Sequence, residues 1–165
     1  MTFAELMDMI FSGQNLAILG AAIAAGLAGC GSAKGVGLVG EASAGMLAED
    51  PTKFGKALLL QALPGTQGIY GLVVAFMIVN TIGLFGTPMT LTTAQGAYFL
   101  MASLPIAIVG YVSGIHQGRV AAAGVNLIAR RPGEVGKAII SAALVETYAI
   151  FALLISLLPI IFFKG

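Results

Sequence analysis

The chain has 165 residues, of which 58% are hydrophobic and only 9% are charged, and its formal net charge is +1. Soluble domains carry roughly a quarter charged residues, so this composition excludes a protein that folds mainly in water. The balanced charge excludes a basic surface for nucleic acid, and the single cysteine, Cys30, excludes an intrachain disulfide or a multi-cysteine metal site.

The N-terminal segment, Met1 to Ser12, contains two acidic residues and no basic one, unlike a cleavable signal, so we expect it in the mature protein. Four later stretches reach the roughly 20 mostly apolar residues that a helix needs to cross a bilayer. In chain order they are Leu16 to Gly29, continuing towards Met46; Ala57 to Gly86; Ala94 to Ile115, continuing towards Ala129; and Ala138 to Phe163. The sequence therefore predicts an all-α membrane protein with four transmembrane helices.

Glycine and alanine crowd the first and third of these helices, with Gly31/Gly35 and Gly114/Gly118 at the spacing that lets membrane helices approach closely. We expect these helices to face an inner radius and the second and fourth, rich in Leu, Ile and Phe, to face lipid. The segment from Gly35 to Gly40 matches a dinucleotide fingerprint, but that fingerprint requires a preceding strand in a soluble βαβ unit. We therefore expect no nucleotide and no organic cofactor.

Basic residues gather at two short connections, one near Pro51 and the other near Pro132. Because positive residues concentrate in cytoplasmic loops, we expect both connections to be cytoplasmic, and both termini and the connection from Thr87 to Thr93 to face outwards. The residues that carry this argument are Lys53, Lys56, Arg130, Arg131 and Lys137.

The two halves of the chain are related by one constant offset, which places Pro51 on Pro132. This match predicts two duplicated helical hairpins, residues 1–86 and residues 87–165. The repeat is imperfect where it matters most, because Glu146 of the second half corresponds to Gly65 of the first. One buried carboxylate is therefore expected for each pair of hairpins.

Glu146 lies about four helical turns past Pro132 and about five before the C-terminus, which places it near the middle of the membrane. A carboxylate there costs on the order of 3 kcal/mol on insertion scales, so it indicates a functional site by default. A protonated glutamate with a structural role is the alternative. His116 and Lys34 also lie within these helices. His116 directly precedes Gln117, a candidate site residue, and consecutive helical residues point about 100° apart, so we expect His116 to face away from the site.

Polar residues of two other helices are expected at the depth of Glu146. Gln117 lies about four helical turns before Pro132, and Thr66 and Gln67 lie about four turns after Pro51. Four residues of the second helix share one face: Leu63, Thr66, Gln67 and Tyr70. We expect Tyr70 to donate a hydrogen bond to the carboxylate, the alternative being packing at the lipid boundary.

Oxygen ligands from these groups suit a hard monovalent cation, whereas a proton would need only the carboxylate. Pro64, within the same face, can also free backbone oxygens as ligands. These extra ligands favour Na+ over H+, and H+ stays as the alternative. Ordinary hydrogen bonding between helices is the other interpretation of the glutamines and Thr66.

Several motifs resemble the V-type ATPase proteolipid, also called the c or K subunit. They are Leu63-Pro-Gly-Thr-Gln-Gly-Ile-Tyr70, Ser113-Gly-Ile-His-Gln-Gly118, Val145-Glu-Thr-Tyr-Ala-Ile150 and Gly31-Ser-Ala-Lys-Gly-Val-Gly37. The resemblance implies a homo-oligomeric ring that a central stalk turns against a stator membrane protein with a key arginine. It also implies a Na+ site formed by Glu146 and, from the other helices, the backbone oxygen of Leu63 with Thr66, Gln67 and Gln117, Tyr70 being the hydrogen-bond partner.

The resemblance implies a non-catalytic subunit that transports one Na+ per protomer while ATP is hydrolysed on other subunits. We expect the ring to contact lipid and to lie in the cell membrane. Three alternatives remain open from the sequence. They are the same ring carrying H+, a secondary transporter or channel that works alone, and a membrane scaffold with no ion role.

Overall fold

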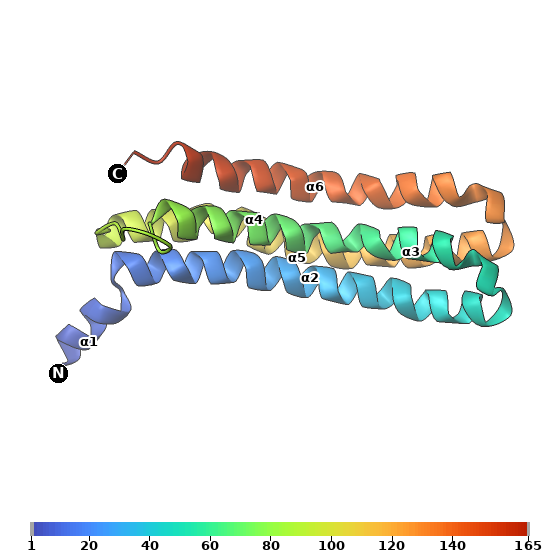
Figure 1. Ribbon diagram of the computed structural model, residues 1–165, viewed down its shortest axis with the longest axis horizontal. Coiled ribbons are helices and arrows are strands. Elements are labelled where there is room, and N and C mark those ends of the chain that lie inside the picture. Colours follow the sequence, from blue (N-terminus) through green and yellow to red (C-terminus); the bar gives the residue numbers. More distant parts are fainter. Residues whose placement is uncertain (1, 165) are drawn as a thin grey trace.

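Helices account for all regular structure in the computed structural model, which describes residues 2–164 (Figure 1). A short N-terminal helix, α1 (Phe3–Ile10), precedes the long helix α2 (Gly13–Glu49). The second span consists of α3 and α4, and the last two spans are α5 and α6. Their bounds, with the 3-10 turns that interrupt or precede them, are η1 (Pro51–Lys53), α3 (Phe54–Ala62), η2 (Leu63–Gly65), α4 (Thr66–Thr81), α5 (Thr93–Arg130), η3 (Pro132–Glu134) and α6 (Val135–Ile161).

Four of these helical segments are long and apolar enough to cross a membrane, which confirms the predicted fold class. They are Gly13–Glu49, Pro51–Thr81, Thr93–Arg130 and Pro132–Ile161. The second ends earlier than the expected Gly86, because Gly83 adopts a φ of 73° that breaks the helix. The first begins earlier than expected, at Gly13, because the Ser12 side chain accepts a hydrogen bond from the Asn15 amide and caps it.

Helices α2 and α5 lie side by side along their length, as the predicted contact between small residues requires (Figure 1). A Cβ added at Gly31 would lie 2.5 Å from Tyr111 Cα, and one added at Gly114 would lie 2.7 Å from the Gly31 carbonyl carbon. The backbones are therefore too close for any side chain at these positions. Helix α4 packs on α2, and α6 packs on α5.

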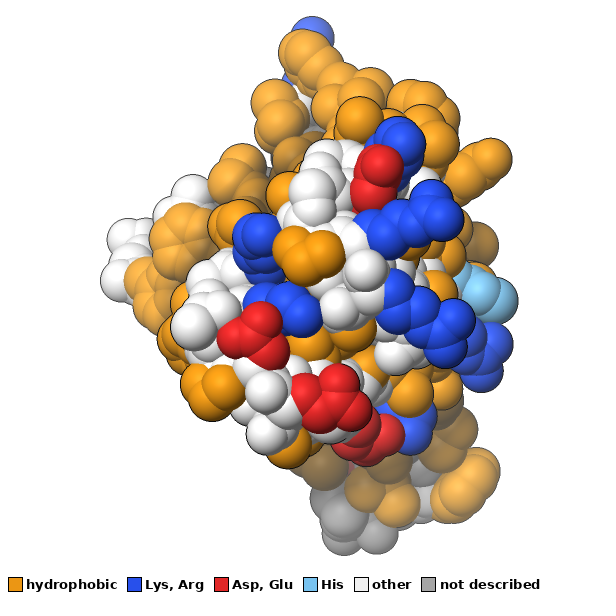
Figure 2. Space-filling view, turned by 90° about the vertical axis from the view of Figure 1, so that its right-hand side faces the viewer, with side chains coloured by type: hydrophobic (Ala, Val, Ile, Leu, Met, Phe, Trp, Pro, Cys, Tyr) orange, Lys and Arg blue, Asp and Glu red, His pale blue; other side chains and the backbone are white. Residues whose placement is uncertain are grey.

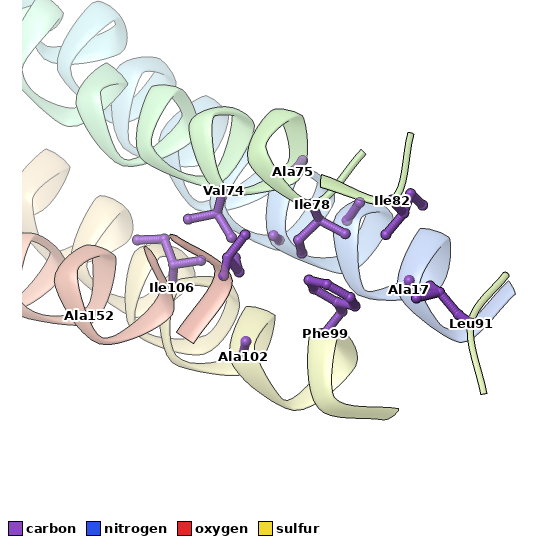
Figure 3. Close-up of a cluster of buried hydrophobic side chains, with 13 residues drawn as sticks. Ala17, Val74, Ala75, Ile78, Ile82, Leu91, Phe99, Ala102, Ile106 and Ala152 are labelled. Atoms are coloured by element: carbon purple, nitrogen blue, oxygen red, sulfur yellow. The ribbon is translucent and has the colours of Figure 1, made fainter. Parts of the chain in front are cut away.

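Two separate apolar clusters fill the bundle. The cluster nearer the termini contains Val74, Phe99 and Ile106 (Figure 3), and the cluster nearer the short connections contains Val39 and Leu60. All five side chains are completely buried. The polar residues described below lie between these two clusters.

The outer faces of the second and last spans are apolar and exposed, as expected for contact with lipid. Their exposed side chains include Leu58, Leu72, Phe76, Ile140, Leu144, Phe151 and Leu154. Other outer positions follow the same pattern. The sides of the chain that these two spans form are therefore suited to contact with lipid.

Charged side chains gather at the end of the bundle that carries the two short connections (Figure 2). Lys53 donates a hydrogen bond to the Ala129 carbonyl at 3.0 Å, and Lys56 donates one to the Pro132 carbonyl at 2.8 Å. These lysines thus bind the backbone of the last turn of α5 and of the second connection. Both termini lie at the opposite end (Figure 1).

Candidate cation-binding site

The break at Pro64 positions the first part of the site. Proline has no backbone N–H and cannot continue the α-helical hydrogen bonds, so the chain forms the tight turn η2 between α3 and α4. The carbonyl oxygen of Leu63 accepts hydrogen bonds from the Thr66 backbone N–H and from the Thr66 hydroxyl, the latter at 3.0 Å. Two oxygen atoms are thereby held next to each other at the bend.

Gln67 follows this turn and is completely buried between the helices. Its Nε2 atom donates to Gln117 Oε1 of α5 at 2.5 Å and to Ser113 Oγ at 3.2 Å. Its Oε1 atom lies 3.5 Å from the Thr66 hydroxyl. The carbonyl oxygen of this amide therefore faces the bend, and its nitrogen faces α5.

The amide of Gln117, also completely buried, links α5 to the carboxylate of α6. Gln117 Nε2 donates to Glu146 Oε2 at 3.2 Å, and the Tyr70 hydroxyl of α4 donates to Glu146 Oε1 at 2.5 Å. Glu146 is half-buried near the middle of α6. Each carboxylate oxygen thus has a donor from a different helix.

The six residues named from the sequence form one contiguous polar network across three spans. It runs from Leu63 through Thr66, Gln67 and Gln117 to Glu146, and Tyr70 completes it. The ion pairs found among residues 2–164, which lie at the short connections, do not include this carboxylate.

The donor set suits a cation of low charge. Among the residues that the structure describes, no three His, Cys, Asp or Glu side chains gather in the kind of cluster that binds a divalent metal ion. The carboxylate is accompanied instead by neutral oxygen atoms of amide, hydroxyl and backbone carbonyl groups. One negative charge with several neutral oxygens matches the charge and ligand preference of a hard monovalent ion.

Sequence reasoning missed Ser113 as a member of the site. Its hydroxyl is buried, accepts a hydrogen bond from Gln67 and donates one to the Val145 carbonyl at 3.0 Å. The sequence feature that could have identified Ser113 is its position about one helical turn before Gln117, which puts both residues on one helix face. Its counterpart in the first repeat, Ser32, instead accepts from the Gly68 backbone N–H at 2.7 Å.

The other polar residues of the membrane segments lie outside this network. His116 is exposed on the single chain and lines a hollow of about 410 Å³ between α5 and α6, together with Tyr148. It faces away from Gln117, as expected. Lys34 is exposed as well, and the ion pairs found among residues 2–164 do not join it to Glu41.

Comparison with known proteins shows one family. The sequence pattern of the family described as the ATP synthase C subunit matches this chain twice, at residues 19–78 and 100–158. The V-type sodium ATPase subunit K of Enterococcus hirae is 48% identical over 159 residues, which cover 94% of this chain and 99% of that protein. The A-type ATP synthase subunit K of Methanocaldococcus jannaschii is 42% identical over 151 residues, which cover 91% of this chain and 64% of that protein.

Proposed function

The chain belongs to the family of the ATP synthase C subunit, and from this membership we propose that it is a rotor-ring subunit of a V-type ATPase that carries Na+ across a membrane. Each protomer carries one ion, and identical protomers form the ring. The two hairpins, residues 1–86 and residues 87–165, are the repeating units within a protomer. The relative in Enterococcus hirae, named as part of a sodium ATPase, supports the choice of ion.

The observation that carries the proposal is the arrangement of oxygen atoms around Glu146. In this proposal Na+ binds the carboxylate together with the Leu63 carbonyl, the Thr66 hydroxyl and the Oε1 atoms of Gln67 and Gln117. These groups already form one connected network inside the bundle, so few side chains need to be ordered when the ion binds. Tyr70 holds the carboxylate oxygen that the Gln117 amide does not bind.

Binding of Na+ neutralises the Glu146 carboxylate, which lets a loaded protomer face lipid at low cost. Release requires a place where water and a fixed positive charge compete for the carboxylate. We assign that charge to an arginine of a stator membrane protein, and rotation to a central stalk bound to the ring. Moving one charge against 100 mV costs about 2.3 kcal/mol, which ATP hydrolysis on other subunits supplies.

The proposed orientation places the ring in the cell membrane with the short connections in the cytoplasm and both termini outside. The basic side chains at the connection end of the bundle support this orientation (Figure 2). The central stalk would then meet the ring at the cytoplasmic end, where Lys53 and Lys56 fasten the two connections together.

A carbodiimide, which modifies protonated carboxyl groups in apolar surroundings, tests the proposal on the assembled complex. We expect it to modify Glu146 and stop ATP-driven transport, and we expect Na+ to protect this residue at alkaline pH. Glu146 modified equally fast with and without Na+ would contradict the Na+ assignment and favour a ring that carries H+. Saturable uptake by the purified ring without any partner would contradict the rotor and favour a transporter that works alone.

A further inference from the structure

We propose that Ser113 is a positioning residue that fixes the direction of the amide groups at the ion site, so that the Gln67 carbonyl oxygen faces the cation. The proposal rests on the proposed function and concerns a residue that does not itself bind the ion. It follows from which atoms along the network can donate a hydrogen bond and which can only accept one.

The Val145 carbonyl can only accept a hydrogen bond. Ser113 Oγ lies 3.0 Å from it and must therefore give its single hydrogen atom to this carbonyl. What remains on the Ser113 oxygen are lone pairs, and these face the side chain of Gln67 at 3.2 Å. Only the Nε2 end of the Gln67 amide can satisfy them.

The orientation of Gln67 then determines that of Gln117. Since Nε2 of Gln67 faces α5, it gives its second hydrogen to Gln117 Oε1 at 2.5 Å. Gln117 must in turn direct its own Nε2 at the Glu146 carboxylate, where it lies 3.2 Å from Oε2. One hydroxyl group thus fixes two buried amides that have nearly the same shape in either orientation.

The same hydroxyl closes the network into a loop. Val145 precedes Glu146 on α6, so Ser113 binds the backbone beside the carboxylate while it orients the amides that reach the carboxylate's side chain. Without this hydroxyl, Gln67 could rotate and present its NH2 group towards Thr66. A cation there would lose one oxygen ligand and meet hydrogen atoms that carry partial positive charge.

The test compares Ser113→Ala with a control that has the same chemistry away from the site. Ser156 is also buried and also joins α5 to α6, because its hydroxyl accepts a hydrogen bond from the Ile106 backbone N–H at 3.1 Å. It lies about three helical turns past Glu146. Equilibrium binding of radioactive Na+ is measured on purified rings of the wild type, Ser113→Ala, Ser113→Thr and Ser156→Ala.

We expect Ser113→Ala to weaken Na+ binding by about fivefold to tenfold, the effect of one lost hydrogen bond and one misplaced ligand. Ser156→Ala should stay within about twofold of the wild type, and Ser113→Thr should restore most of the affinity because it keeps the hydroxyl. If the alanine variant does not assemble, Ser113→Cys, which keeps the volume and bonds weakly, should show the same loss.

Three results would overturn the proposal: wild-type affinity in assembled Ser113→Ala rings, an equal loss in Ser156→Ala, or no recovery in assembled Ser113→Thr rings. Each of them leaves Na+ transport by the wild type intact and therefore speaks against Ser113 alone. Absence of saturable Na+ binding in the wild type would instead remove the proposed function and this proposal with it.

Discussion

The Tyr70 hydroxyl donates a hydrogen bond of 2.5 Å to Oε1 of Glu146, which joins α4 to the carboxylate of α6. Tyr70 itself is partly buried and packs against the apolar cluster nearer the termini. Leu63, in the turn that precedes α4, packs against the other cluster. The carboxylate is therefore positioned by a side chain that the surrounding apolar residues hold in place.

Replacing Tyr70 by phenylalanine removes this donor and leaves the ring of the side chain in place. A hydrogen bond to a charged group contributes about 1.5–3 kcal/mol, so Na+ binding should weaken by about tenfold or more. Tyr98→Phe is the matched control, because the Tyr98 hydroxyl of α5 also bonds to α6, at the Pro159 carbonyl, 2.9 Å away. Equal affinities of the two variants in a Na+ binding assay would contradict a role for Tyr70.

Replacing Glu146 by glutamine removes the negative charge at nearly constant volume. We expect transport by the reconstituted complex to stop, and the ring to be as stable as before or more so, because burying the charge costs on the order of 3 kcal/mol. Asp8→Asn, an exposed acid on α1, should leave transport unchanged. Transport that continued in Glu146→Gln would support the scaffold interpretation.

A side chain at Gly31 should separate α2 from α5. An added Cβ would lie 2.5 Å from Tyr111 Cα, so Gly31→Val should destabilise the protein by about 1–3 kcal/mol or prevent assembly. Gly136→Ala is the control, because nothing lies within 4 Å of a Cβ added there and alanine favours the helix by up to about 1 kcal/mol. Thermal dissociation of the ring, followed on a gel, measures both effects.

The orientation can be tested with cysteines, because Cys30 is the sole native one. In a Cys30→Ala background, Thr52→Cys and Gly133→Cys should react with a membrane-impermeant maleimide in inverted vesicles only. Thr87→Cys should react in right-side-out vesicles only. The reverse pattern would overturn the proposed topology.

The first connection should respond to acid. The Thr52 hydroxyl, which donates a hydrogen bond to Asp50, holds the pKa of that carboxyl below its usual 3.8. Since the folded pKa is the lower one, the stabilisation is present above pH 3.8 and is lost as the pH falls through the folded value. Thr52→Val should raise the pKa of Asp50 towards 3.8, as measured by carboxyl NMR shifts in the detergent-solubilised ring.

The number of helical residues between each polar residue and Pro51 or Pro132 was enough to predict which polar residues lie at the same depth. Gln67, Gln117 and Glu146 lie at the same height because helices of fixed rise start from connections at one end of the bundle. The family resemblance drawn from the motifs is confirmed by both comparisons. The fold class followed from helix length and composition alone.

Two features could not be predicted in this way. The direction of the amide groups depends on Ser113, whose partner is a backbone carbonyl of another helix, and a backbone atom leaves no signal in the sequence. The early end of α4 depends on a positive φ at Gly83, one glycine among 23. The first is set by a contact between helices distant in the chain, and the second by a local turn in which the Gly83 N–H bonds to the Asn80 carbonyl.

The two apolar clusters lie on either side of the polar site residues along the bundle, and they block ion conduction through it. An ion cannot travel along the axis of a single bundle, because completely buried side chains such as Phe99 and Leu60 block the way to either end. The half-buried edge formed by Thr66, Tyr70 and Glu146 is where an ion would have to enter and leave, sideways. A protomer on its own thus has no continuous path for an ion. Transport across the full thickness of the membrane requires that the whole site be carried from one entry point to another.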